Sequence, residues 1–197
     1  MDQEQWQFLL SAEGQRVLAE TAATPLTEEN HLQVASRLRK QIDPTLAQAV
    51  IETVWLRQRA AVKFSKASEM YFTRSALEQS SSETVSNYRA RRFFLAGYGC
   101  IADLGCGAGG DAVGLSGGAD VVGIDLDWIR LAMARENVRV YGNSGRFFPL
   151  QANLVTQPAL AGDALFFDPA RRDELGRRIK SGHFYRPPLS LIEHWRV

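Results

Sequence analysis

A run of glycines directly after a short apolar segment is the clearest sign of chemistry in this sequence. The segment is residues 101–104, and the loop after it contains Gly105, Gly107, Gly109 and Gly110. Glycine suits a tight turn that needs positive φ, and it lets a ligand come close to the backbone. A helical pattern resumes at Ala112, and the first N–H groups of that helix would face an anionic group. The pattern predicts a strand, a ligand-binding loop and a helix in that order.

Acidic residues accompany the apolar segments. Asp103 lies within the first segment, and Asp125 ends the second one, 20 residues beyond Gly105. At this spacing a doubly wound fold places the carboxylate that binds ribose hydroxyls. Asp127 is the alternative, although its position favours the N-cap of the helix that follows. Asp168 comes directly after the fourth apolar segment.

The alternation of strand-like and helix-like segments predicts a parallel α/β sheet. Strands are expected at residues 101–104, 119–125, 146–150 and 164–167. Ligands of such sheets bind beyond the carboxyl ends of the strands. The glycine loop, Asp125, Asn153 and Asp168 all fall at these ends, so we expect them to share one site.

The amino-terminal part of the sequence predicts a small helical domain. The apolar spacing indicates two short helices, a third from residue 28 to about 40 capped by Thr27, and a fourth over about 44–62. The buried face of the third helix is expected to carry Leu32, Ala35 and Leu38. We interpret the aromatic residues of this region as core, the alternative being a ligand platform.

The segment 63–82 has no clear periodicity and contains the consecutive residues Met70, Tyr71, Phe72, Thr73 and Arg74. Two interpretations stay open: a lid over a bound ligand, or a linker that packs its aromatic residues on the helical domain. We predict that this segment lies against the ligand cleft. The helix after it, capped by Ser81 or Ser82, carries the three arginines Arg89, Arg91 and Arg92. They form either a phosphate-binding face or, more commonly, a solvated one.

Composition limits the class of protein. The 197 residues are 45% hydrophobic and 23% charged with a net charge of +1, so overall charge identifies no partner. Cys100 and Cys106 are the two cysteines, which argues against a disulfide framework and for a reducing compartment. The sequence shows no metal-ligand pattern, secretion signal or membrane-spanning run. We therefore expect a cytoplasmic protein that binds no metal.

The glycine loop alone is ambiguous, because Gly105, Gly107 and Gly110 also satisfy the GxGxxG fingerprint of dinucleotide-binding proteins. The wider set is more specific. Asp103, Gly105, Gly107 and Gly109 have the form acid-x-Gly-x-Gly-x-Gly, and an acid–proline step follows the fourth strand. Together these features resemble the class I S-adenosylmethionine-dependent methyltransferases over roughly residues 63–172. The order FT, DLGCGAGGD, GIDLD, ARENVRVYG and FFDPARR is most similar to the RNA-directed branch that includes trimethylguanosine synthases, and to bacterial methyltransferases with a THUMP-like domain.

The resemblance implies roles for individual residues. Asp103 and the glycine backbone would hold the methionine part of the cofactor, Asp125 the ribose, and Asn153 the adenine amine. The full cofactor-binding set is Phe72, Thr73, Asp103, Gly105, Gly107, Gly109, Asp125, Leu126 and Asn153. Asp168 and Pro169 match the start of the family's Asp/Asn-Pro-Pro-aromatic motif, which orients an exocyclic amine for methylation, and are the catalytic candidates. Ala170 and Arg171 replace the second proline and the aromatic residue, so stacking of that aromatic residue on a base is lost.

Basic residues follow this motif closely. The stretch contains Arg171, Arg172, Arg177, Arg178, Lys180 and Arg186 against two acids, Asp173 and Glu174. Arginine pairs bidentately with phosphate, so we expect the first four arginines to contact RNA phosphates. The alternative is a solvated loop without a ligand.

We therefore expect a helical domain and connecting segment over residues 1–80, and a partial Rossmann-like domain over 81–197. The family sheet continues beyond a fourth strand, whereas residues 173–197 suffice for a loop and a helix near 188–196, so we expect a fragment of a longer protein or an unfinished sheet. The predicted function is S-adenosylmethionine-dependent methylation of rRNA or tRNA. The alternatives are an NAD-type oxidoreductase and a non-catalytic fragment that binds the cofactor or nucleic acid.

Overall fold

A computed structural model of the chain describes residues 1–157, 162–169, 182, 185 and 187–195. Four helices open the fold: α1 (Gln3–Leu10), α2 (Ala12–Ala22), α3 (His31–Leu38) and α4 (Pro44–Ala60). Local chemistry fixes where they begin. Asp2 and Gln5 form a capping box at α1, Ser11 caps α2, and Asp43 caps α4 just before the proline at its first position.

The third helix differs from the sequence prediction. Thr27 does not cap it, because Thr27 and Asn30 bond reciprocally through side chain and backbone, and these bonds form a turn before the helix. The helix therefore begins at His31 rather than at residue 28. Ala35 and Leu38 are buried as predicted, but Leu32 is 78% exposed. The prediction for Leu32 was wrong: at about 100° per residue Leu32 lies roughly 120° around the helix from Leu38, and the structure leaves this edge of the helix exposed.

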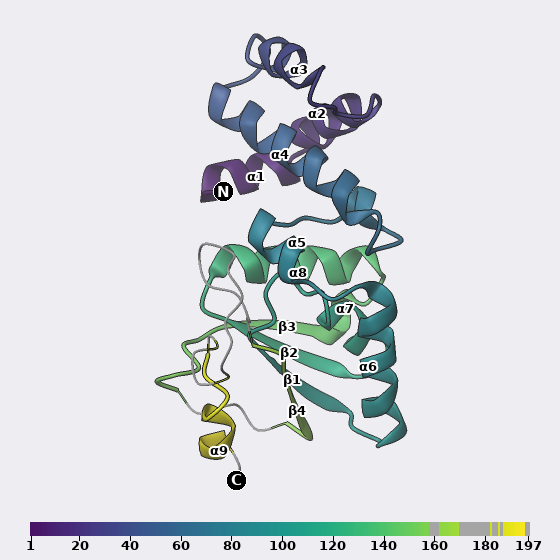
Figure 1. Ribbon diagram of the computed structural model, residues 1–197, viewed down its shortest axis with the longest axis vertical. Helices are drawn as coiled ribbons and strands as arrows, with labels where there is room; N and C mark the ends of the chain where they lie inside the picture. The colour runs from purple at the N-terminus through teal and green to yellow at the C-terminus, as the bar shows by residue number, and fades with distance from the viewer. Residues whose placement is uncertain (158–161, 170–181, 183–184, 186, 196–197) are drawn as a thin grey trace.

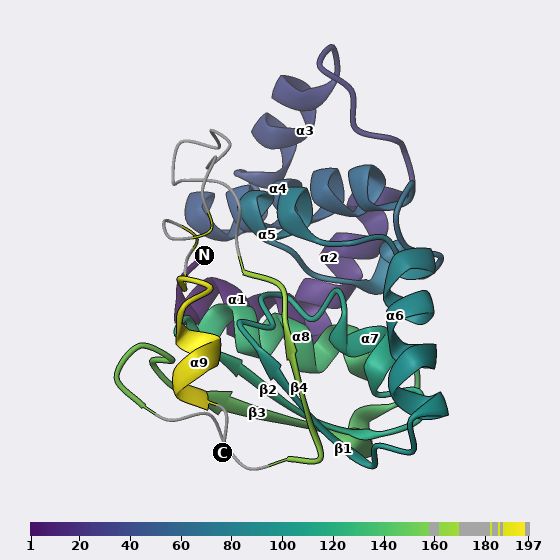
Figure 2. The same cartoon turned by 60° about the horizontal axis from the view of Figure 1, so that its bottom comes forward.

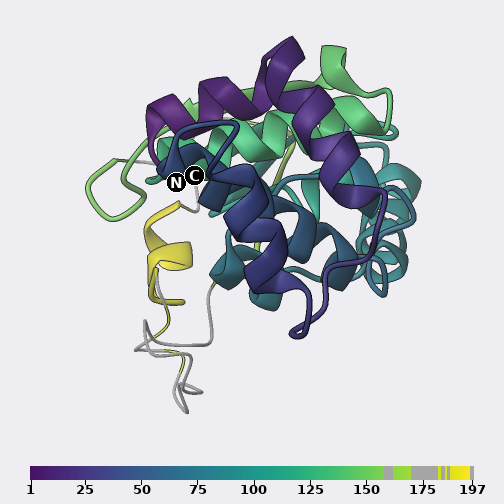
Figure 3. The ribbon, with the colours of Figure 1, turned by 90° about the horizontal axis from the view of Figure 1, so that it is seen from above.

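Short elements connect these helices to the sheet. They are the 3-10 turn η1 (Ala67–Glu69), α5 (Arg74–Gln79) and α6 (Glu83–Leu95). Thr73 caps α5 and Ser82 caps α6, each accepting a hydrogen bond from a backbone N–H three residues later. In Figure 1, α5 and α8 (Trp128–Val140) lie between the first four helices and the sheet. Seen from above, helices of the first four lie over part of α8 (Figure 3).

Within the described residues, the sheet has four parallel strands in the order β3-β2-β1-β4. The strands are β1 (Cys100–Leu104), β2 (Asp120–Asp125), β3 (Phe147–Gln151) and β4 (Ala164–Phe167). The remaining elements are α7 (Ala112–Leu115), α8 (Trp128–Val140), η2 (Ser144–Arg146) and α9 (Leu191–Trp195). The predicted Rossmann-like α/β fold is confirmed, although the helix after the glycine loop is only four residues long.

Two apolar clusters cover the two faces of the sheet. Alternate residues of a strand point to opposite faces, and Ile101 joins the larger cluster, which extends continuously into the first four helices. Leu104 belongs to the smaller cluster, together with Trp195 of α9. Figure 2 shows α9 on the side of the sheet away from α7 and α8. None of the helices in the described residues has the length and apolar character of a membrane span.

Candidate functional site

The glycine loop joins β1 to α7 at the carboxyl edge of the sheet. Its first two N–H groups, of Gly105 and Cys106, donate to the carbonyl of Ile124 at 2.8 and 3.0 Å, so the loop lies over the end of β2. Gly105 and Gly107 have φ of 81° and 56°. Nothing lies within 4 Å of a Cβ built at either position. The loop therefore presents bare backbone beside open space, as close approach of a ligand requires.

Asp125 ends β2 directly below this loop. It is 8% exposed, and its Oδ2 accepts a hydrogen bond from Gly107 N at 3.0 Å while its Oδ1 accepts one from Asp127 N at 2.9 Å. A carboxylate has about four acceptor positions, so both oxygens retain capacity for a hydroxyl group. Asp127 caps α8 by accepting from Ile129 N at 2.9 Å, which confirms the predicted N-cap.

Asp103, on β1, is a buried acid with an unpaired carboxyl oxygen. It is 2% exposed, and its Oδ2 is buried without a hydrogen-bond partner. Burial raises the pKa of this carboxyl well above its ordinary value, and the charges of Asp111, Asp125 and Asp168 raise it further. Arg89 acts in the opposite direction. The site thus contains four carboxyl groups, and Arg89 contacts two of them, Asp111 and Asp168, so the arrangement favours a cationic ligand.

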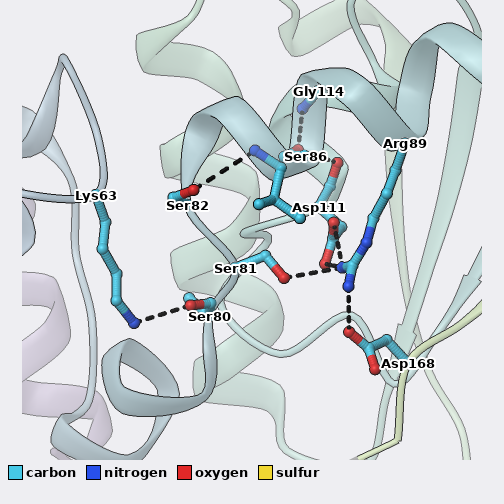
Figure 4. A network of polar contacts seen from close by, with 10 residues as sticks. Lys63, Ser80, Ser81, Ser82, Ser86, Arg89, Asp111, Gly114 and Asp168 are labelled. Carbon is cyan, nitrogen blue, oxygen red and sulfur yellow. Dashed lines mark hydrogen bonds and ion pairs between the residues drawn. The ribbon is translucent and has the colours of Figure 1, made fainter.

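Arg89 holds two of these acids, as Figure 4 shows. Its Nη1 lies 2.9 Å from both carboxylate oxygens of Asp111 and 2.8 Å from the hydroxyl of Ser81, and its Nη2 lies 3.1 Å from Asp168 Oδ2. Its guanidinium carbon also lies 5.6 Å from the centre of the Phe166 ring. The sequence offered a phosphate-binding face or a solvated face for the arginines of α6. Arg89 instead pairs with acids of the site, and Arg91 and Arg92 are exposed. Sequence reasoning missed this role because nothing local distinguishes Arg89 from its neighbours.

Ser86, on α6, contacts the end of the glycine loop. Ser86 is fully buried; its hydroxyl donates to the carbonyl of Asp111 at 3.0 Å and accepts from Gly114 N at 3.1 Å. A Cβ at Gly114 would clash with this hydroxyl, so α6 and α7 pack closely here. An open groove of about 520 Å³ lies between α6 and β4 and is lined by Phe93, Phe166 and Arg89 among others.

Four other predicted site residues within the described part of the chain follow the ends of β2, β3 and β4. Asp168 and Pro169 follow β4 directly, and Asp168 faces Arg89. Leu126 follows Asp125 and is 64% exposed. Asn153 is exposed after β3, and its Oδ1 accepts from Val155 N at 3.0 Å. The remaining predicted residues, Arg171, Arg172, Arg177 and Arg178, lie outside the described part of the chain.

The connecting segment packs the ring of Tyr71 on Trp6 of α1, as the second of the two interpretations of this segment predicts. The Phe72 ring is 2% exposed and stacks on Phe64 of the same segment, with ring centres 5.4 Å apart. Thr73 caps α5. The backbone of Tyr71 is nevertheless joined to the glycine loop through Asn137. A role of Phe72 and Thr73 in holding a cofactor stays a prediction. Within the described residues, no group of His, Cys, Asp and Glu is arranged for a metal ion.

Two family models match the chain. Residues 98–181 match "RNA cap guanine-N2 methyltransferase", and residues 2–60 match a domain of unknown function (DUF8688). An uncharacterized S-adenosylmethionine-dependent methyltransferase of Mycobacterium tuberculosis, found in two strains, is 35% identical over 159 residues, which are 75% of this chain and 41% of the relative. The chain thus spans less than half the length of these relatives.

Solved structures of methyltransferases are among the matches. An O-methyltransferase from Bacillus cereus in complex with SAH is 17% identical, covers 46% of each chain and has a TM-score of 0.40. An RNA methyltransferase from Salinibacter ruber in complex with S-adenosyl-L-homocysteine is 24% identical, covers 45% of this chain and 61% of that chain, and has a TM-score of 0.37.

The sequence matches agree with the geometry. The matched residues include the glycine loop, the acid at the end of β2 and the acid–proline step after β4, all at one edge of a parallel sheet. The described part of this region therefore has a Rossmann-like α/β fold, and its sequence is similar to that of methyltransferases, among which the M. tuberculosis relatives are named as S-adenosylmethionine-dependent.

Proposed function

We propose that this protein transfers the methyl group of S-adenosylmethionine to RNA. The observation that carries the proposal is the buried, unpaired Oδ2 of Asp103 beside the open backbone of Gly105 and Gly107. A buried carboxylate oxygen without a partner is costly, and a cationic ligand that pairs with it removes that cost. The amino group of the cofactor's methionine part carries such a charge.

The residues of the site fit the rest of the cofactor. Asp125 is held in place by two backbone N–H groups and keeps acceptor capacity for the ribose hydroxyls. Leu126 offers an exposed apolar side chain next to it, and the adenine amine is assigned to Asn153. When bound, S-adenosylmethionine supplies a methyl group on a positively charged sulfur, which a nucleophile takes in one displacement.

The chain's own contribution to the reaction is positioning. Asp168 lies at the carboxyl end of β4, where its carboxylate can accept a hydrogen bond from an amine of the substrate, and Pro169 fixes the backbone after it. Arg89 holds Asp168 through one nitrogen and Asp111 through the other. The acceptor acid and the end of the glycine loop therefore keep a constant separation. Alignment of the nucleophile with the methyl group accounts for most of the barrier reduction in such a reaction.

RNA as the substrate is supported by the family description, which names an RNA cap guanine. The arginines that follow the acid–proline motif agree with a polyanionic substrate. We further propose a division into a helical region at residues 1–80 and a methyltransferase region at 81–197, which the separate family matches at 2–60 and 98–181 support. We expect the protein to act in the cytoplasm.

Thermal unfolding with added ligands tests the cofactor. A ligand that binds the folded state alone raises the melting temperature by mass action. We expect S-adenosylhomocysteine to raise it and NAD to leave it unchanged. Stabilisation by NAD alone would favour the oxidoreductase alternative and contradict the proposal. Transfer of a labelled methyl group to total RNA, measured in the longest reading frame that contains this chain, tests the substrate; labelling of protein but not RNA would replace RNA as the acceptor.

A further inference from the structure

The side chain of Tyr71 belongs to the helical region. Its ring contacts Trp6 of α1 edge-on, with ring centres 5.1 Å apart, and its hydroxyl accepts a hydrogen bond from Gln15 of α2 at 2.7 Å. The guanidinium of Arg57 on α4 lies 4.6 Å from the ring centre. The Tyr71 side chain thus contacts three helices and is 3% exposed. Its position is fixed by the packing of residues 3–60.

The backbone of Tyr71, in contrast, contacts α8 and is linked through it to the glycine loop. Tyr71 N donates to Oδ1 of Asn137 at 2.7 Å, and Asn137 Nδ2 donates back to the Tyr71 carbonyl at 2.8 Å. The same Nδ2 donates to the carbonyl of Ala108 at 2.8 Å. Ala108 stands between the loop glycines Gly107 and Gly109. Asn137 is fully buried, so water does not compete for these bonds.

A second contact joins the connecting segment to the same loop. A Cβ at Gly110 would lie 3.2 Å from Ser80, so these two residues touch. Lys63, just after α4, donates to the carbonyls of Ser80 and Leu77 at 2.8 and 2.7 Å and so fixes the end of α5 (Figure 4). The loop is therefore held by the connecting segment at both Ala108 and Gly110.

We propose that the helical region, through Tyr71 and Asn137, sets the conformation of the glycine loop and thereby the affinity for the cofactor. Glycine loses more conformational freedom on ordering than any other residue. A loop that is ordered before the ligand arrives avoids this entropy loss on binding. Tyr71 and Asn137 are positioning residues, and the region of residues 2–60 acquires a function in cofactor binding. This inference rests on the proposed function of the loop.

The experiment separates this coupling from general stability with two variants on α4. Arg57→Met removes the hydrogen bonds to the carbonyls of Met70 and Glu69 and the contact with the Tyr71 ring, without touching the loop. Arg59→Met is the matched control, because Arg59 is exposed and stacks on Trp55 instead. Titration calorimetry with S-adenosylhomocysteine, well below the melting temperature, should show about fivefold or greater weakening for Arg57→Met and none for Arg59→Met.

A third variant acts at the connection itself. Asn137→Asp keeps the shape but places a carboxylate oxygen against the carbonyls of Ala108 and Tyr71, and we expect about tenfold or greater weakening. Because this buried change can unfold the protein, amide hydrogen exchange of residues 105–110 is measured in Arg57→Met without ligand. Faster exchange than in Arg59→Met supports the coupling. Equal exchange and equal affinity in the two α4 variants would overturn it.

The outcomes distinguish the two proposals. Absence of S-adenosylhomocysteine binding by the unaltered protein contradicts the proposed function, and the exchange rates alone then decide the coupling. Binding by the unaltered protein with the same affinity in Arg57→Met, and with equal exchange, contradicts the coupling and leaves the proposed function standing.

Discussion

Replacing Asp103 by asparagine should stabilise the protein and weaken its binding of the cofactor. The substitution keeps the shape of the side chain and removes a charge that is buried, lacks a partner at Oδ2 and faces Asp111, Asp125 and Asp168 with Arg89 as the opposing cation. The asparagine amide still lacks a partner at this position, but a neutral group costs less to bury than a charge, and we take the difference as about 1–3 kcal/mol. We expect the free energy of unfolding to rise by about this amount at pH 8, and each kcal/mol corresponds to about 2–4 °C in melting temperature.

The gain in stability should depend on pH. The pKa of Asp103 is raised in the folded state, so the folded state binds the proton more tightly than the unfolded state. The unaltered protein therefore has the full contribution of this group below the ordinary aspartate pKa and loses it as pH rises through the raised pKa. The variant does not titrate at this position. The difference between the two proteins should be small near pH 4 and should grow toward pH 8.

Urea unfolding at several pH values, with calorimetric titration of S-adenosylhomocysteine, tests both effects. Burial raises the pKa of the Cys106 thiol in the folded state, and the charges of Asp103 and Asp125 raise it further, so the series stays below pH 8.5 and under reducing conditions to keep this thiol protonated in the unfolded state as well. Asp120→Asn, at an exposed position on β2, is the control and should change stability by less than about 0.5 kcal/mol. Affinity should fall about 10- to 100-fold in Asp103→Asn, since a charge-assisted hydrogen bond is lost. Destabilisation at pH 8, or a gain that does not vary with pH, would refute the reasoning about this carboxylate.

Other substitutions address the remaining parts of the site. Asp125→Ala removes the acceptor of Gly107 N and of the ribose hydroxyls. Calorimetry should show that the affinity for S-adenosylhomocysteine falls by a factor of about ten or more. An unchanged affinity would assign this role to Asp127. Arg89→Met leaves Asp111 without its cation and should lower the free energy of unfolding by about 1–3 kcal/mol in urea, while Arg89→Lys, which cannot span two acids, should recover only part of it; full recovery would show that charge alone matters. Replacing Arg177 and Arg178 by alanine should flatten the salt dependence of RNA binding by up to about one unit per lost phosphate contact, and equal slopes in a salt titration of labelled RNA would remove them from the interface.

The sequence determined the class of fold and the place of the cofactor loop. Alternating apolar runs and helical periods predict a parallel sheet without any knowledge of distant contacts. The glycines of the loop and the acid 20 residues beyond Gly105 follow from local requirements for backbone freedom and strand ends. Capping residues such as Asp43, Ser82 and Asp127 marked helix starts correctly because their hydrogen bonds stay within three residues. Thr27 shows the limit, since a competing turn with Asn30 used the same short-range bonds.

Only the tertiary structure decided which polar groups meet and how they are charged. Arg89 pairs with Asp111, 22 residues away, and Tyr71 bonds to Asn137, 66 residues away, and no local pattern specifies either partner. The raised pKa of Asp103 likewise results from complete burial among acids from three other segments. Desolvation and Coulomb interactions depend on distance in space rather than on position along the chain. The sequence therefore specifies where a ligand can approach, and the packing of helices on the sheet specifies the charge and rigidity with which the ligand is held.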